Sequence, residues 1–187
     1  IGCEFASIFN SLGTKVHLVD TKDHIMSNED PDVREFLKNA FDTRGITIIP
    51  SSRYHTHEVC GEGIRTILST SKIVTEMIML AVGRTPNSNN INLESTGVKV
   101  DNHNYIEINE NICTNVPHIY AVGDVGNRNV PSDLSLVHVA EAEGRCAAAN
   151  ILDVEYPQGL DHIPYIVFTH PMLAGAGVTE EYVKKKY

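Results

Sequence analysis

The sequence has 187 residues, which is long enough for one domain or two small ones with a buried core. Hydrophobic residues make up 42% and charged residues 21%, as in ordinary globular proteins, and no apolar run approaches the roughly 20 residues that a membrane-spanning helix needs. The net charge of −9 argues against a nucleic-acid surface, because phosphate binding needs clustered Lys and Arg, so we expect neither a nucleic-acid nor a membrane partner.

The first part of the sequence predicts alternating helices and strands. Residues 3–12 carry apolar side chains at helical spacing, and Gly13 is typical of the residue that ends a helix. The stretch KVHLVD predicts a strand, and Pro31 suits the start of the next helix, which Gly45 would end before the strand ITIIP. Four apolar residues are expected on one side of that helix: Val33, Phe36, Leu37 and Phe41. This β-α-β-α-β order predicts a parallel sheet with helices on its faces.

From about Arg53 the pattern changes to shorter strands. The stretches RYHTHEV and IRTILST flank a turn at Gly61 and Gly63, and they predict an antiparallel excursion that returns to a buried strand in IVTEMIMLAVG. After the loop GRTPNSNN come short strands around VKV and YIEI, an apolar strand IYAV, and a helix from roughly 135 to 152. The final stretch, IPYIVFTHPMLAGAGVTEEYVKKKY, predicts a further unit that begins with a strand and a helix.

The opening stretch IGCEFASIFNSLGTKVHLVD suits a dinucleotide-binding unit. In such units glycines let the backbone approach the pyrophosphate, and a helix amino terminus offers free N–H groups. The acid that ends the second strand accepts hydrogen bonds from ribose hydroxyls. Here Gly2 is the single candidate glycine, and Asp20 stands at the end of the second strand. An ordinary βαβ unit explains these two residues equally well.

Four stretches together resemble a known family, in order and in spacing: IGCEFASIFNSLGTKV, AVGRTPN, TNVPHIYAVGDV and EAEGRCAAANI. The family is the class I pyridine nucleotide–disulfide oxidoreductases, flavoproteins that include dihydrolipoamide dehydrogenase, soluble pyridine nucleotide transhydrogenase and mercuric reductase. The resemblance covers essentially the whole sequence. It implies an α/β fold, with a Rossmann-like FAD/NAD(P)-binding domain made of a parallel sheet and an antiparallel β excursion, and the start of an α+β dimerisation domain.

The resemblance also implies a domain organisation. Residues 1–84 would be an NAD(H)-binding domain without its first strand, 85–155 the carboxyl-terminal part of the FAD-binding domain, and 160–187 the start of the dimerisation domain. The first two glycines of G-x-G-x-x-G, the C-x-x-x-x-C redox pair and the HPT motif are absent. We therefore expect an internal fragment of a homodimeric enzyme, with no catalytic residue of its own.

Five residues would bind NAD(H). Gly2 matches the third glycine of the fingerprint G-x-G-x-x-G-x-E, and Glu4 matches its acid, which lies near the nicotinamide in relatives. Asp20 stands where NAD-dependent members carry an acid, so NAD(H) is favoured over NADP. Gly83 and Arg84 of AVGRTPN would border the nicotinamide. The Arg84 guanidinium could pair with a carboxylate or phosphate, or be solvated in a loop.

Five further residues would bind FAD. Asp124 matches the family residue that contacts the FAD ribitol, and Gly123 would permit the close approach. The backbone of Leu136, Val137 and His138 would form a helix amino terminus pointing at the flavin pyrimidine ring. A helix amino terminus stabilises the negative charge that reduction places there.

The function implied is an FAD-dependent oxidoreductase that passes hydride between NAD(P)H and flavin, and then to a disulfide or a second acceptor. Relatives of the dihydrolipoamide dehydrogenase or transhydrogenase kind fit best. The alternatives are a non-catalytic dinucleotide-binding fragment, and another two-domain flavoprotein of the NADH oxidase or ferredoxin reductase kind. The stretch FTHPMLAGAGVTEE favours the class I dimer over that last alternative.

Several conspicuous residues receive no site role. Four cysteines occur without C-x-x-C or zinc-like spacing, which is typical of unpaired thiols in a reducing cytoplasm: Cys3, Cys60, Cys113 and Cys146. His55 and His57 alternate on a predicted strand without a further ligand, so no metal site is expected. Cys3 is interpreted as a packing residue, although a helix amino terminus can lower a thiol pKa. His170 lies in FTHP, not in an HPT motif, and is assigned no catalytic role.

Overall fold

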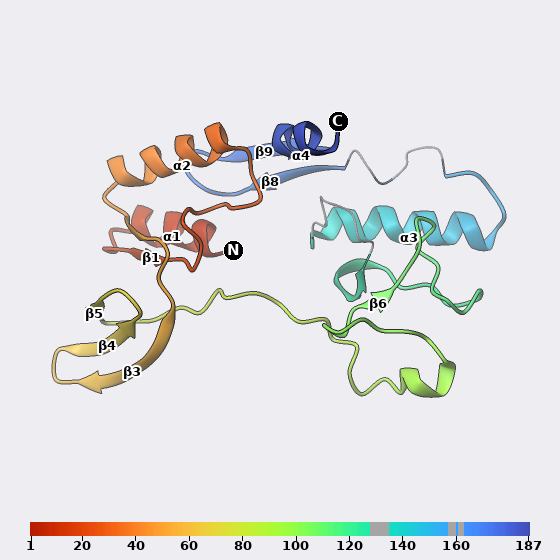
Figure 1. Cartoon of the computed structure of the whole chain (residues 1–187), viewed down its shortest axis with the longest axis horizontal. Helices are drawn as coiled ribbons and strands as arrows, with labels where there is room; N and C mark the ends of the chain where they lie inside the picture. Colours follow the sequence, from red (N-terminus) through yellow and green to blue (C-terminus); the bar gives the residue numbers. More distant parts are fainter. Residues whose placement is uncertain (128–134, 157–159, 161–162) are drawn as a thin grey trace. The chain divides into compact units, whose positions relative to one another are not determined.

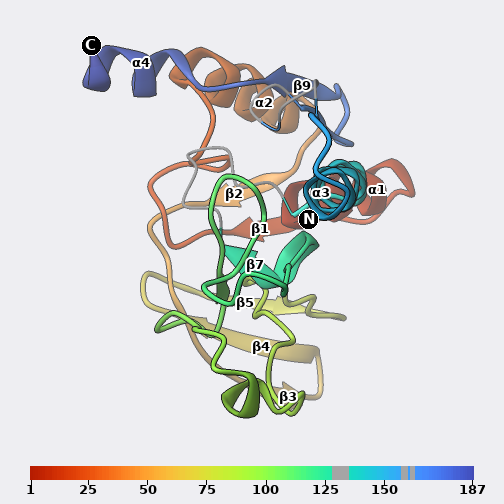
Figure 2. The ribbon, with the colours of Figure 1, turned by 90° about the vertical axis from the view of Figure 1, so that its right-hand side faces the viewer.

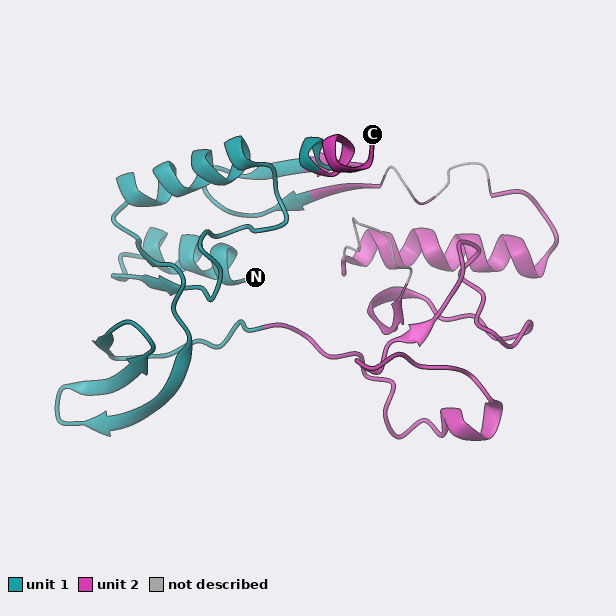
Figure 3. Cartoon of the chain, viewed as in Figure 1, with its two compact units in different colours: residues 1–82, 166–174, 179–181 teal, residues 83–165, 175–178, 182–187 magenta. Residues whose placement is uncertain are grey.

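The computed structural model describes residues 1–127, 135–156, 160 and 163–187 (Figure 1). They form two compact units (Figure 3). Unit 1 contains residues 1–82, 166–174 and 179–181. Unit 2 contains residues 83–165, 175–178 and 182–187. The assignment of an NAD(H)-binding, an FAD-binding and a dimerisation domain to residues 1–84, 85–155 and 160–187 stays a prediction.

A β-α-β arrangement builds unit 1. The strands β1 (His17–Val19) and β2 (Thr47–Ile49) pair in parallel, and α2 (Pro31–Thr43) connects them. Helix α1 (Gly2–Ser11) precedes β1 and packs on it (Figure 1). The predicted alternation of helices and parallel strands is thus confirmed.

Helix α2 shows how the sequence sets the core of unit 1. Pro31 occupies its first turn, and Gly45 follows its end with φ +78°. Leu37 and Phe41 are fully buried, in a cluster with four other buried residues: Ala6, Ile25, Ile46 and Leu173. Phe36, predicted on the same side, is instead 57% exposed. The reason is that Phe36 lies about 100° around the helix from Leu37, off the face that Leu37 and Phe41 share.

A three-stranded antiparallel sheet follows, as predicted. Its strands are β3 (Tyr54–Cys60), β4 (Gly63–Leu68) and β5 (Lys72–Thr75), which Figure 2 labels. Gly63 begins β4 with φ +129°, and a Cβ there would lie 2.6 Å from the Thr75 carbonyl oxygen. Glycine is therefore required at this turn.

The stretch after β5 differs from the prediction of a buried strand. Met77, Leu80 and Val82 are 79%, 65% and 87% exposed, and strand structure ends at Thr75. Among the described residues no strand pairs with this stretch. A strand is stabilised by backbone hydrogen bonds to a neighbour, so apolar composition alone does not form one. The prediction of a buried strand here is wrong for this structure.

Unit 2 combines short strands with one long helix. The strands β6 (Ile106–Glu107) and β7 (Gly126–Asn127) pair in parallel. Two 3-10 helices lie at η1 (Leu93–Thr96) and η2 (Gly123–Val125), and α3 spans Val137–Ile151, within the predicted bounds. The predicted strand IYAV is wrong, because Tyr120 forms only an isolated antiparallel bridge with Cys113. Most of the polar loop before α3 lies outside the described residues.

Three elements complete the described chain. Strands β8 (Pro164–Val167) and β9 (Leu173–Ala176) form a two-stranded sheet, and α4 spans Glu180–Lys186. The Asp30 carboxylate accepts hydrogen bonds from the Glu180 and Glu181 amides at 2.9 and 3.0 Å. Asp30 therefore satisfies two amides at the start of α4. No helix among the described residues has both the length and the apolar character that crossing a membrane requires.

Candidate functional site

An open groove in unit 2 gathers most of the predicted flavin-contacting residues. Its volume is about 610 Å³. Seven residues line it: Arg84, Asp124, Ser135, Leu136, Val137, Ala140 and Glu141. They come from the AVGR stretch, from η2 and from the start of α3, which are distant in sequence. Folding therefore places both charged candidates, Arg84 and Asp124, beside the start of the helix.

The turn that presents Asp124 depends on the glycine before it. Gly123 has φ +74°, a left-handed conformation that other residues rarely adopt. A Cβ at this position would lie 3.3 Å from the Ala140 Cβ, so α3 also packs closely against the turn. The Asp124 side chain is 45% exposed and lines the groove. Gly123 thus supplies the left-handed backbone conformation of the turn, and Asp124 supplies an accessible carboxylate.

Arg84 pairs with this carboxylate. Its Nη1 donates a hydrogen bond to Asp124 Oδ2 at 2.6 Å, and both side chains are about half exposed. An exposed ion pair of this kind stabilises a fold by only about 0–1 kcal/mol. Its main effect is to orient the carboxylate. Of the roles considered for Arg84, the structure shows pairing with a carboxylate, and Gly83 before it adopts φ +127°.

The amino terminus of α3 lies at the groove. Leu136 is its N-cap residue, and no side chain of the described residues caps it. The first amides of a helix have no intrahelical partner and carry partial positive charge. The His138 imidazole is hydrogen-bonded through Nε2 to the Pro164 carbonyl oxygen at 2.6 Å. The imidazole therefore has a backbone partner of its own, and the expected contribution of His138 to the site is through its N–H.

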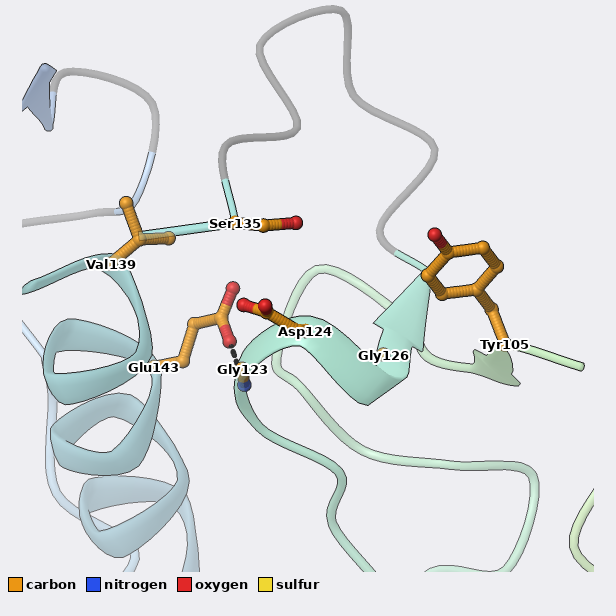
Figure 4. A pocket seen from close by; sticks show the side chains of 7 residues that line it. All are labelled: Tyr105, Gly123, Asp124, Gly126, Ser135, Val139 and Glu143. Carbon is orange, nitrogen blue, oxygen red and sulfur yellow. Dashed lines mark hydrogen bonds between the residues drawn. The ribbon is translucent and has the colours of Figure 1, made fainter. Parts of the chain in front are cut away.

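A small cavity of about 10 Å³ lies behind the turn (Figure 4). Its lining residues are Tyr105, Gly123, Asp124, Gly126, Ser135, Val139 and Glu143. Glu143 is only 3% exposed, and its Oε2 accepts the Gly123 N–H at 2.5 Å. Glu143 was not among the predicted site residues. The available signal was a charged residue in helical register with the buried Val139, Cys146 and Ala147.

In unit 1, the first turns of α1 hold the segment that follows β8. Glu4 Oε1 accepts the Phe168 N–H at 3.0 Å, and Ser7 Oγ accepts the His170 N–H at 2.8 Å. Burial acts to raise the pKa of Glu4, and the hydrogen bond from the Phe168 amide acts to lower it; the pKa lies below its ordinary value. Gly2 begins this helix, and a Cβ there would make only ordinary contacts with Ala81 and Leu18.

Asp20 lies directly after β1, where the carboxyl end of a parallel strand presents ligand-binding groups. Its Oδ1 accepts the Lys22 N–H at 2.9 Å. Its backbone is held on both sides, because the Asp20 amide donates to Ile49 and its carbonyl accepts from Ser52. The carboxylate is therefore fixed in place and partly exposed. Gly2, Glu4 and Asp20 belong to unit 1, whereas Gly83 and Arg84 belong to unit 2.

Two of the residues that were assigned no site role, Cys3 and His57, make structural contacts. Burial raises the pKa of Cys3 to about 11, so its thiol stays protonated and packs against the core of unit 1. His57 Nδ1 is hydrogen-bonded to the Tyr54 hydroxyl. No cluster of metal-ligating side chains occurs among the described residues.

The sequence matches known proteins along nearly its whole length. The profile of the family described as pyridine nucleotide-disulphide oxidoreductase matches residues 1–144. Dihydrolipoyl dehydrogenase of Chlamydia pneumoniae is 32% identical over 179 residues, which are 96% of this chain and 38% of that protein. Soluble pyridine nucleotide transhydrogenase of Pseudomonas fluorescens strain SBW25 is 34% identical over 186 residues, 99% of this chain and 39% of that protein.

Solved structures show the same fold. The crystal structure of LpdA from Mycobacterium tuberculosis matches with a TM-score of 0.86 and 26% identity, over 98% of this chain and 39% of that one. The flavoprotein disulfide reductase RclA from Escherichia coli matches with a TM-score of 0.81 at 22% identity, over 97% of this chain and 41% of that one, a likeness of fold alone. The fold is therefore α/β and Rossmann-like, and the chain spans less than half the length of these proteins. The chain belongs to the pyridine nucleotide-disulphide oxidoreductase family.

Proposed function

We propose that the whole protein is an FAD-dependent oxidoreductase that passes hydride between NAD(P)H and flavin, and then to a disulfide or a second acceptor. The observation that carries this proposal is the groove of unit 2. It combines the Asp124 carboxylate, the paired Arg84 guanidinium and the amino terminus of a 15-residue helix that no side chain in the described part of the chain caps. Dihydrolipoyl dehydrogenase and pyridine nucleotide transhydrogenase, the curated relatives, are the kinds of enzyme that this proposal favours.

The groups that line the groove fit an FAD molecule. Asp124 supplies carboxylate acceptors, which suit the hydroxyls of a ribityl chain. The amides of Leu136, Val137 and His138 supply donors, which suit the oxygen and nitrogen acceptors of a pyrimidine ring. FAD, when bound, would supply the hydride-accepting chemistry. The chain's own residues would bind it, orient it and stabilise negative charge near the start of α3.

For the nicotinamide cofactor we propose NAD(H), bound by Gly2, Glu4, Asp20, Gly83 and Arg84. The support comes from Asp20, whose carboxylate is fixed at the end of β1 by the Lys22 amide. A carboxylate there accepts hydrogen bonds from ribose hydroxyls and repels a 2′-phosphate. Glu4 would lie near the nicotinamide, at the start of α1.

The remaining proposals concern the whole protein. We propose a homodimer, as the family resemblance implies. We propose a cytoplasmic location, supported by four free cysteines at positions 3, 60, 113 and 146. A non-catalytic dinucleotide-binding protein is the alternative. It would bind the same cofactors but would not exchange hydride between them.

The test is an anaerobic titration of the purified whole protein with NADH, followed through the visible absorbance of flavin. The proposal predicts a yellow protein whose flavin absorbance is bleached by NADH, and reoxidation by a disulfide or a dye acceptor. A flavin-containing protein that NADH leaves unchanged would favour the non-catalytic alternative. A protein without flavin would contradict the proposal.

A further inference from the structure

Glu143 is a buried carboxylate outside the groove. Glu143 is 3% exposed, and it lies on the same buried face of α3 as Val139 and Cys146. A carboxylate at such a position is costly unless it accepts hydrogen bonds. Glu143 accepts one from the backbone N–H of Gly123 at 2.5 Å (Figure 4).

This hydrogen bond reaches the turn that carries Asp124. Gly123 adopts φ +74°, and α3 touches it at two positions, through the Ala140 Cβ and through the Glu143 carboxylate. Ala140 and Glu143 are three residues apart and therefore share one helix face. Asp124 is the next residue along the chain, and its carboxylate lines the groove. Because Gly123 is held against α3, the position of Asp124 is set relative to the start of the same helix.

We propose that Glu143 is a positioning residue for FAD binding: by accepting the Gly123 N–H, it fixes the GDV turn so that Asp124 presents its carboxylate to the groove. This inference rests on the proposed function, in which Asp124 binds the ribityl chain of FAD. A buried N–H that loses its acceptor is costly, and a turn that is already held need not be ordered when ligand binds.

Three substitutions separate the hydrogen bond from the charge. Glu143→Gln keeps an oxygen acceptor at the same reach and removes the charge. Glu143→Asp keeps the charge but draws the carboxylate back by one methylene. Glu143→Leu keeps the approximate size and removes the acceptor. Glu155→Leu, at an exposed position after the end of α3, is the matched control.

The measurement is the dissociation constant of FAD from the apo form of the whole protein, with ADP as a competitor. ADP shares the adenosine diphosphate half of FAD and lacks the ribityl chain. We expect Glu143→Asp and Glu143→Leu to weaken FAD binding about tenfold or more, because the Gly123 N–H loses its acceptor. Their ADP constants should change less than about twofold, because the lost positioning acts on the ribityl contact alone. Glu143→Gln should stay within about threefold of wild type for FAD, because it restores the acceptor.

Each other result overturns the inference. Equal FAD constants in all variants would show that the turn needs no support from Glu143. A parallel loss of FAD and ADP binding would show a general structural role. Weak binding by Glu143→Gln, equal to that of Glu143→Leu, would show that charge matters and not the acceptor. A wild-type protein that does not bind FAD would instead refute the proposed function, and the inference would fall with it.

Discussion

At the scale of single residues, the site is defined by carboxylates held by backbone amides. Asp20 is fixed by the Lys22 amide, Glu4 by the Phe168 amide, and the Gly123 amide is bound by Glu143. A carboxylate that is held in one orientation can accept a ligand hydroxyl without first being ordered. These contacts therefore hold Asp20 and Glu4 in one orientation and fix the turn that precedes Asp124.

Asp20 is expected to set the choice between NADH and NADPH. Replacing it with Ser removes the negative charge that would repel a 2′-phosphate. The ratio of kcat/KM for NADPH to that for NADH should rise about tenfold or more in the Asp20→Ser variant of the whole protein. Asp23→Ser, which removes a nearby exposed charge, should leave the ratio unchanged. Equal ratios in the wild type and in Asp20→Ser would remove Asp20 from the site.

Glu4 is expected to make stability depend on acidic pH. Its pKa in the folded chain lies below the ordinary value of 4.5, and the hydrogen bond from the Phe168 amide lowers it against the effect of burial. A lowered pKa stabilises the fold above the unfolded value, and this stabilisation is lost as the pH falls through the folded value. The urea midpoint should therefore drop less between pH 7 and pH 3 in Glu4→Gln than in the wild type. Parallel pH profiles would contradict this role of Glu4.

At the scale of elements, α2 carries much of the core of unit 1. Leu37→Ala should reduce the free energy of unfolding by about 2–5 kcal/mol, because it opens a cavity at a fully buried position. Phe36→Ala removes an even larger side chain from the adjacent, 57% exposed position, and should cost less than about 1 kcal/mol. Urea unfolding of both variants checks the comparison. A larger loss for Phe36→Ala would show that the core face of α2 is assigned wrongly.

Local signals in the sequence predicted most of the regular elements. Gly13 and Gly45 have positive φ after α1 and α2, and Pro31 begins α2, because these residues act through their own backbone. Strands that need a distant partner were predicted less well. The apolar stretches 77–82 and IYAV were expected to be strands, but a strand depends on a hydrogen-bonded neighbour that composition does not specify.

For the candidate site, the sequence predicted some of the residues but not the contacts that hold them. The family motifs indicated Asp124 and the start of α3, and the structure places both at one groove. The contacts that hold them were not predictable, because Arg84 is 40 residues from Asp124 and Glu143 is 20 residues from Gly123. Pairings at such separations depend on the packing of η2 against α3, which no local pattern encodes.

At the scale of the whole molecule, the chain consists of two compact units with different parts of the proposed machinery. Unit 1 contains the acids proposed for NAD(H), and unit 2 contains the groove proposed for FAD. The chain covers 38% and 39% of the two curated relatives compared above. Hydride transfer between two cofactors is therefore proposed for the whole protein. The experiments that test hydride transfer use the whole protein for this reason.

The central claim is that Asp124 binds FAD in the groove of unit 2. The most direct measurement is the dissociation constant of FAD from the apo form of the whole protein, for the wild type, for Asp124→Leu and for the exposed control Glu155→Leu. We predict that Asp124→Leu weakens FAD binding at least about tenfold, as the loss of a charged acceptor implies, while the control binds as the wild type does. Equal affinities in the wild type and Asp124→Leu would contradict the claim.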